Sequence, residues 1–214
     1  MAFYMKHSLL VTRPNSDRTT RYISTWAEKV ISLAQEKGLA VFDLARNRAN
    51  RKELESMIRR NEPSLIFLNG HGHDTVVTGQ DGEVLIEAGS NENILKKRIV
   101  YALSCRSGKV LGPRCVQAGT EAYIGYDEDF IFLFEESKRT HPEQDKTAEL
   151  FLTPSNQVVI SLLKGHSAEE AHANSKRSFV RNIKKLLSSQ TSSSDSQAVR
   201  YLIWDMQHQV CLGN

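Results

Sequence analysis

The sequence predicts an α/β three-layer sandwich, in which a mostly parallel β-sheet lies between two layers of helices. Three observations predict it. Short apolar runs of strand length alternate with longer segments of helical periodicity. The third of these runs is apolar through its middle, as a strand covered on both faces must be. The segments between the runs are long enough for the crossovers that parallel strands require. No repeat or second boundary interrupts residues 1–214, so we expect one domain.

The first third of the chain contains three predicted strands and two predicted helices. The strands are predicted at residues 8–12, 39–44 and 64–69. Between the first two, apolar residues recur every three or four positions and stop at Gly38, which predicts a helix. Asn50 and Glu53 have the spacing of a capping box, so a second helix is expected to begin there and to end before Pro63.

The rest of the chain begins with strands and continues with helices. Residues 76–87 alternate around Gln80–Gly82, which predicts a hairpin. Further strands are predicted at 99–104, 121–126 and 208–212. Helices are predicted at 129–137, 143–152, 154–164 and about 168–187, the last opened by a capping box, and around 199–206. The Ser-rich residues 188–196 are expected to form a flexible surface loop.

Charge and composition exclude several classes of protein. The net charge of +3 is spread over segments of mixed sign, and the short basic clusters lack interleaved aromatic residues, so no nucleic-acid partner is expected. No apolar run approaches the roughly 18 residues of a membrane span, and Lys6 and His7 interrupt the start before it reaches signal-peptide length. Three cysteines without disulfide-scaffold spacing favour a reducing compartment. We therefore expect a cytoplasmic protein with no membrane association.

A histidine and a cysteine follow two of the predicted strands. His71 comes two residues after the strand at 64–69, and Cys105 comes directly after the strand at 99–104. Ligands of open α/β sheets bind beyond the carboxyl ends of the strands, and neighbouring strands lie about 4.8 Å apart. A nearby imidazolium would lower the pKa of the thiol and make it a nucleophile. The N–H groups of Gly72 and Cys105 are candidates for an oxyanion hole.

The two strand ends resemble a known family. An apolar strand ending in Asn69-Gly-His-Gly72, followed about thirty residues later by one ending in Ala102-Leu-Ser-Cys-Arg-Ser-Gly108, resembles the caspase-like (clan CD) cysteine peptidases. Among these, the sequence is most similar to bacterial CHAT-domain peptidases, with separase and the metacaspases as relatives. The resemblance implies about six strands, a catalytic dyad without metal or cofactor, and cleavage of a protein substrate. Carried over by position, Cys105 is the nucleophile and His71 the base.

The resemblance also implies a pocket for one substrate side chain and control of the activity. Many relatives carry an acidic or small residue in the two positions before the nucleophile, where this chain has Leu103 and Ser104, so this segment gives the pocket no acidic group. Asp127 and Asp129, with Glu128, are then the nearest candidates to bind a basic substrate residue. They could equally be the acidic first turn of the next helix. Activity is expected to await an activating or regulatory protein, or a cut.

Each of these residues also has a simpler interpretation. Cys105 could be a small buried hydrophobic residue, and His71 could cap a turn. His73 is a rival base. His71, His73 and Asp74 together also suggest a metal hydrolase, although the chain lacks the further residues of a binuclear metal site at the required spacing. A doubly wound, flavodoxin-like binding or signalling module without catalysis is the alternative to a peptidase.

Overall fold

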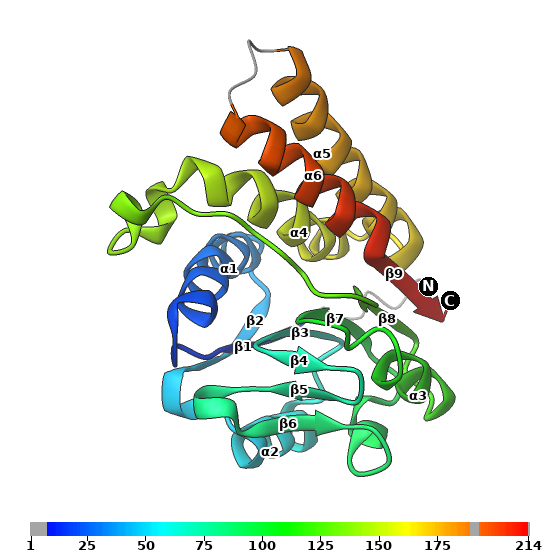
Figure 1. Cartoon of the computed structure of the whole chain (residues 1–214). Helices are drawn as coiled ribbons and strands as arrows, with labels where there is room; N and C mark the ends of the chain where they lie inside the picture. The colour runs from blue at the N-terminus through cyan, green and yellow to red at the C-terminus, as the bar shows by residue number, and fades with distance from the viewer. Residues whose placement is uncertain (1–7, 189–192, 214) are drawn as a thin grey trace.

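The computed structural model describes residues 8–188 and 193–213, and these residues form a central sheet of six strands (Figure 1). The strand order is β2-β1-β3-β7-β8-β9. Their bounds are β1 Ser8–Arg13, β2 Ala40–Ala45, β3 Leu65–Asn69, β7 Ile99–Leu103, β8 Ala122–Tyr126 and β9 Gln209–Gly213. The first five are parallel, and β9 runs antiparallel to β8. The predicted mostly parallel sheet is confirmed.

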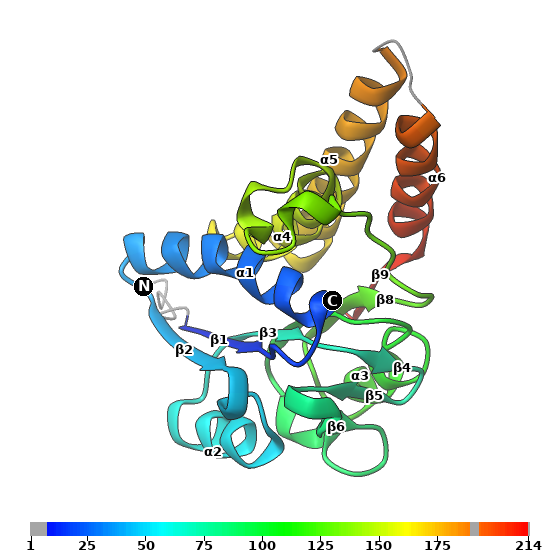
Figure 2. The same cartoon turned by 60° about the vertical axis from the view of Figure 1, so that its left-hand side comes forward.

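Helices cover both faces of this sheet (Figure 2). One face carries α1 (Arg18–Glu36), α4 (Lys146–Leu163) and the start of α5 (Ala168–Ser188). The other face carries α2 (Arg51–Asn61) and α3 (Leu111–Gln117). The last helix, α6 (Ser193–His208), packs on α5 and leads directly into β9. This arrangement makes the three layers that the alternating sequence predicts.

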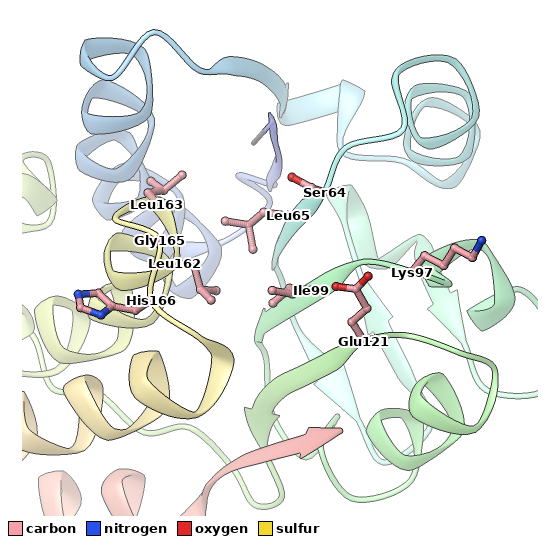
Figure 3. A pocket seen from close by; sticks show the side chains of 9 residues that line it. All are labelled: Ser64, Leu65, Lys97, Ile99, Glu121, Leu162, Leu163, Gly165 and His166. Carbon is pink, nitrogen blue, oxygen red and sulfur yellow. The ribbon is translucent and has the colours of Figure 1, made fainter. Parts of the chain in front are cut away.

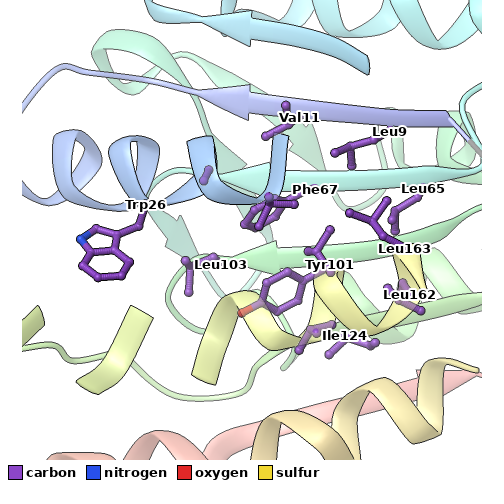
Figure 4. Close-up of a cluster of buried hydrophobic side chains, with 14 of the residues drawn as sticks. Leu9, Val11, Trp26, Leu65, Phe67, Tyr101, Leu103, Ile124, Leu162 and Leu163 are labelled. Atoms are coloured by element: carbon purple, nitrogen blue, oxygen red, sulfur yellow. The ribbon is translucent and has the colours of Figure 1, made fainter. Parts of the chain in front are cut away.

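The buried strands divide their side chains between two cores. In β3, Leu65 and Phe67 face the α1–α4 side, whereas Ile66 and Leu68 face the α2–α3 side. Figure 4 shows the first core, in which Phe67 stacks on Tyr101 of β7 with ring centroids 5.2 Å apart. Because both faces are covered, the strand is apolar from Leu65 to Leu68. This explains why a run without alternation is correctly predicted as a strand.

A small antiparallel sheet lies on the α2 side of the molecule. It consists of β4 (Gly72–His73), β5 (Val76–Thr78) and β6 (Val84–Glu87). The predicted hairpin at 76–87 is confirmed, with a 3-10 turn at Gln80–Gly82. The strand β4 was not predicted, because two residues are too few to show a periodic pattern. It matters for function because it contains Gly72.

The helices predicted between residues 129 and 164 differ from those in the structure. Residues 129–135 form no helix, because Phe130, Phe132 and Phe134 pack at every second position against the core and Tyr22. The two helices predicted at 143–152 and 154–164 are the single helix α4, which begins at Lys146 and continues through Pro154. A helical proline frees the carbonyl four residues earlier, and here Leu150 O accepts a hydrogen bond of 2.8 Å from Asn182 Nδ2.

The end of the chain also differs from the prediction. Of the loop predicted at 188–196, residues 189–192 lie outside the described part of the chain. Ser193 already begins α6, so the part of this stretch that the structure describes is helical. The short helix α3 was not predicted, because Gly112 and Pro113 weaken its helical pattern.

A buried hydrogen-bond group fastens α1 to the start of α4. Tyr22 is fully buried and donates its hydroxyl to Asp145 Oδ2 at 2.9 Å. Asp145 also accepts the N–H of Ala148 at 2.8 Å, as the N-cap of α4, and the N–H of Glu135 at 2.7 Å. This single carboxylate therefore organises the segment between β8 and α4.

Replacing Tyr22 by phenylalanine should lower the free energy of unfolding by roughly 1.5–3 kcal/mol, because a hydrogen bond to a charged acceptor is lost without a change of shape. Urea denaturation should show a lower midpoint with an unchanged slope. Tyr201→Phe, on the partly exposed side of α6, is the matched control and should change the midpoint little. Equal effects of the two variants would contradict this assignment.

Candidate active site

The predicted nucleophile and base follow neighbouring strands in matching register. The strands β3 and β7 are parallel neighbours in which Asn69 pairs with Leu103, so His71 and Cys105 both lie two residues beyond the last pair. The turns that carry them touch. A Cβ atom built on Gly72 would lie 2.5 Å from the Cys105 carbonyl oxygen and 3.1 Å from the Cys105 nitrogen. Only glycine allows this close backbone approach.

The imidazole of His71 pairs with a carboxylate that sequence reasoning missed. Its Nε2 lies 2.5 Å from Asp17 Oδ2. Asp17 follows β1 and caps α1, in a capping box with Thr20. The chain continues from β1 to β2 on one side of the sheet and from β3 to β7 on the other. The pair therefore lies at the topological switch point, where open α/β sheets bind ligands. An acidic residue after a predicted strand, with a capping residue three positions on, was the available signal.

The charge of Asp17 suits it to orient a histidine. Burial raises the pKa of the Asp17 carboxyl, but the Thr20 N–H and the His71 ring outweigh burial, so this pKa lies below its ordinary value. Asp17 is therefore ionised at neutral pH and can accept a hydrogen bond that orients the His71 ring. The rival base, His73, is exposed in β4 opposite Val76.

The thiol of Cys105 is half-buried and faces a backbone carbonyl. Its Sγ lies 3.9 Å from the carbonyl oxygen of Phe130. Burial raises the pKa of the Cys105 thiol, and the carboxylates of Asp129 and Asp205 add to this. The direction is opposite to the lowered pKa that the sequence predicts. The physical reason is that a segment after β8 covers the sulfur and brings carboxylates toward it.

Arg106 connects three loops around the thiol. It adopts a left-handed backbone conformation with φ 54°, and its N–H donates to Glu128 O at 3.1 Å. Its Nε lies 3.2 Å from Asp129 Oδ1 and 3.6 Å from Asp74 Oδ1. Asp74 belongs to the turn after His73, and Asp129 to the segment after β8. The guanidinium thus ties the histidine turn and that segment to the nucleophile turn.

The two aspartates predicted to bind substrate already have partners. Asp127 Oδ1 lies 2.9 Å from His208 Nδ1, and Asp129 Oδ1 contacts Arg106 as described. Both follow β8 at the carboxyl edge of the sheet, on the side of Cys105. A basic substrate residue would therefore have to compete with His208 or Arg106 for these carboxylates.

Two hollows flank the sheet in different places. An open hollow beside Asp17 is lined by Asn15, Ser16, Asp17, Arg18, Arg21 and Arg139. Figure 3 shows a mostly apolar pocket at the opposite, amino edge of the sheet, where Leu65, Ile99 and Leu162 form its floor. This second pocket contains none of the predicted site residues.

The described part of the chain offers neither a metal site nor a membrane span. Within residues 8–188 and 193–213, no group of three or more His, Cys, Asp and Glu side chains is placed to hold a metal ion. Nor does any helix in these two stretches have the length and apolar character needed to cross a membrane.

Comparison with solved structures identifies the fold. The Arg-specific cysteine proteinase gingipain R (RgpB) superposes on 98% of this chain with a TM-score of 0.63 and 12% sequence identity. The complex of Porphyromonas gingivalis RgpB pro- and mature domains gives a TM-score of 0.60 at the same coverage of this chain. The chain has the fold of the caspase-like cysteine proteases. At 12% identity the likeness concerns the fold alone.

The chain is much shorter than the proteins that it superposes on. It spans 46% and 47% of the two gingipain chains. A secreted C11 cysteine protease from Bacteroides thetaiotaomicron, "iotapain", matches 58% of this chain at a TM-score of 0.41. No protein-family model and no curated protein matches the sequence. The CHAT-domain resemblance therefore depends on the sequence motifs alone.

Proposed function

We propose that this protein is a cysteine endopeptidase in which Cys105 is the nucleophile and His71 the general acid and base. The observation that carries the proposal is the contact between the two turns, where Gly72 has no room for a side chain against the Cys105 backbone. The caspase-like fold supports it, because cysteine proteases share that fold. Asp17 becomes a third member of the site, since it holds Nε2 of His71 and leaves Nδ1 to exchange a proton.

The reaction proceeds in two steps. His71 takes the proton of the Cys105 thiol, the sulfur forms a bond to the scissile carbonyl carbon, and the C–N bond breaks as His71 gives that proton to the leaving amine. Water then attacks the thioester while His71 takes a proton from it, and the C–S bond breaks to release the acid. The N–H groups of Gly72 and Cys105 are the proposed donors to the oxyanion in both steps.

Asp127 and Asp129 remain the proposed binding groups for a basic substrate residue. Gingipain R is named as Arg-specific, and a guanidinium entering this site could exchange with Arg106 at Asp129. The arginines beside Asp17 line a hollow of the opposite charge, which the sequence did not predict. A preference for cleavage beside basic residues would favour the side of Asp127 and Asp129, and a preference for acidic residues would favour the side of the arginines.

A peptide library of mixed sequence tests the proposed function directly. We expect new termini that depend on Cys105, detected by mass spectrometry against a Cys105→Ala background. Activity is expected to need a partner or a cut, so full activity of the purified chain would contradict that part of the proposal. A library left uncut under all conditions would favour the binding or signalling module, to which the covered thiol and the flavodoxin-like start of the strand order also point.

Asp129→Asn should reduce kcat/KM by about tenfold for peptides with a basic residue at the cut, since a charge-assisted bond to the substrate is weakened. Peptides with a neutral residue there should be cleaved at an unchanged rate. Glu36→Gln, at the exposed carboxyl end of α1, serves as the control. Equal losses for basic and neutral peptides would assign Asp129 a role in holding Arg106 instead.

A further inference from the structure

The segment that covers Cys105 lies between the nucleophile turn and the end of α6. We call residues 127–131 the covering segment. On one side, Glu128 O accepts the Arg106 N–H at 3.1 Å, and Phe130 O lies 3.9 Å from Cys105 Sγ. Figure 1 shows the chain leaving β8 and passing the lower end of α6 on its way to α4. A backbone carbonyl of this segment thus lies against the half-buried thiol.

On its other side, the covering segment is bonded to the last turns of α6. Asp127 N–H donates to His208 O at 3.0 Å, in addition to the ion pair of their side chains. Trp204 Nε1 donates to Asp129 O at 2.9 Å. Ile131 N–H donates to Asp205 Oδ1 at 2.9 Å. Three residues of α6 therefore hold alternate residues of the covering segment.

One peptide unit connects the two sides. The Phe130 carbonyl and the Ile131 N–H belong to the same planar trans peptide, in which C=O and N–H point in opposite directions. Asp205 holds the N–H, and this directs the carbonyl toward Cys105. A rotation of this peptide about the chain would break both contacts together. The position of the carbonyl over the thiol therefore depends on α6.

Asp205 is poorly explained by stability alone. Its side chain is fully buried, and Oδ2 has no hydrogen-bond partner among the described residues. Burial raises the pKa of the Asp205 carboxyl well above its ordinary value, against the smaller effect of the Ile131 N–H. A buried acid with half of its acceptors unused costs folding free energy. Such a residue is expected where geometry, and not stability, is the requirement.

We propose that Trp204 and Asp205 are positioning residues that hold the covering segment over Cys105, so that α6 controls whether the thiol is accessible. This inference depends on the proposed function only where it treats the Cys105 thiol as a nucleophile, because the contacts that hold the segment do not depend on catalysis. A substrate can reach the sulfur only after the Phe130 carbonyl moves away from it. In this structure the carbonyl lies against the thiol, and release of the Trp204 and Asp205 contacts frees it to move away.

The rate of alkylation by iodoacetamide at each cysteine, measured by mass spectrometry on the full chain, tests the proposal without any substrate. Trp204→Phe removes one donor and should raise the rate at Cys105 about fivefold, and Asp205→Ala about tenfold. Asp205→Asn keeps an oxygen that can accept the Ile131 N–H and should stay within about twofold of the wild type. Cys115 is fully buried, and its rate should not change.

Ile203→Ala is the matched control, because Ile203 and Trp204 are neighbours in α6 with the same exposed fraction of 36%. It should leave the rate at Cys105 unchanged. The proposal is overturned if Trp204→Phe leaves Cys105 unchanged, or if Cys105 and Cys115 accelerate together, which would mean general loosening. Where Asp205→Ala unfolds the chain, Trp204→Phe decides. If the variants label faster at Cys105 but none of them cleaves a peptide, the proposed peptidase activity is wrong. The control of thiol access by α6 would still hold.

Discussion

Replacing either Cys105 or His71 by alanine should abolish peptide cleavage, each lowering kcat/KM by roughly 10³-fold or more. The reason is that neither group works alone. Without the sulfur no thioester forms, and without the imidazole the leaving amine is not protonated. Because the two act as a unit, the double variant should be no slower than the worse single variant. The measurement is kcat/KM on the best peptide from the library.

Two further variants separate this pair from its neighbours. His73→Ala should retain most of the activity if His71 is the base, and the reverse result would transfer the role to His73. Cys211→Ala removes the other half-buried thiol and should be neutral. The dyad is refuted if His71→Ala and His73→Ala both leave cleavage intact. All variants should unfold at the same urea concentration as the wild type, within error.

Replacing Gly70 by alanine should destabilise the protein by about 3 kcal/mol, at the upper end of overpacking effects. The added Cβ would lie 1.8 Å from the carbonyl oxygen of Thr78, a backbone atom that no rotamer change can move. Thr78 also donates its N–H to His71 O at 2.9 Å, so moving β5 displaces the histidine turn. We therefore expect a loss of both stability and catalysis, read from urea denaturation and peptide cleavage.

Gly82→Ala gives the reference for this experiment. Gly82 has no neighbour within 4 Å of an added Cβ, but its φ of +79° favours glycine. Its replacement should cost about 1 kcal/mol from backbone strain alone, with cleavage unchanged. A Gly70→Ala variant as stable as Gly82→Ala would show that β5 yields easily. The rigidity assigned to the histidine turn would then be wrong.

Local pattern was enough for most elements of the fold. The strands at 64–69 and 99–104 are apolar and short, and the capping pair Ser167 and Glu170 opens α5 as predicted. The same local reading failed for the covering segment. Its acidic start resembles the first turn of a helix, whereas Phe132 and Phe134, which follow it, pack on Tyr22, far away in the sequence. Such a contact is not visible in a local window of sequence.

The residues of the candidate site also fall into two groups, those indicated by local sequence and those that depend on tertiary contacts. The residue types at two strand ends indicated His71 and Cys105 as candidates, because the carboxyl ends of parallel strands always meet at one edge. Asp17 carried only the signal of a helix cap after a strand, and Trp204 and Asp205 carried none. Each of the three acts through a partner more than fifty positions away. Their roles depend on which loop lies against which helix.

The sequence by itself determined the parallel sheet, its order of elements along the chain and the two turns that carry the candidate dyad, because apolar periodicity and glycine placement are local properties. Only the tertiary structure decided the state of the site. The packing of residues 127–131 between α6 and the nucleophile turn covers the thiol and raises its pKa. Burial and long-range hydrogen bonds set that state, and neither exists before the chain has folded.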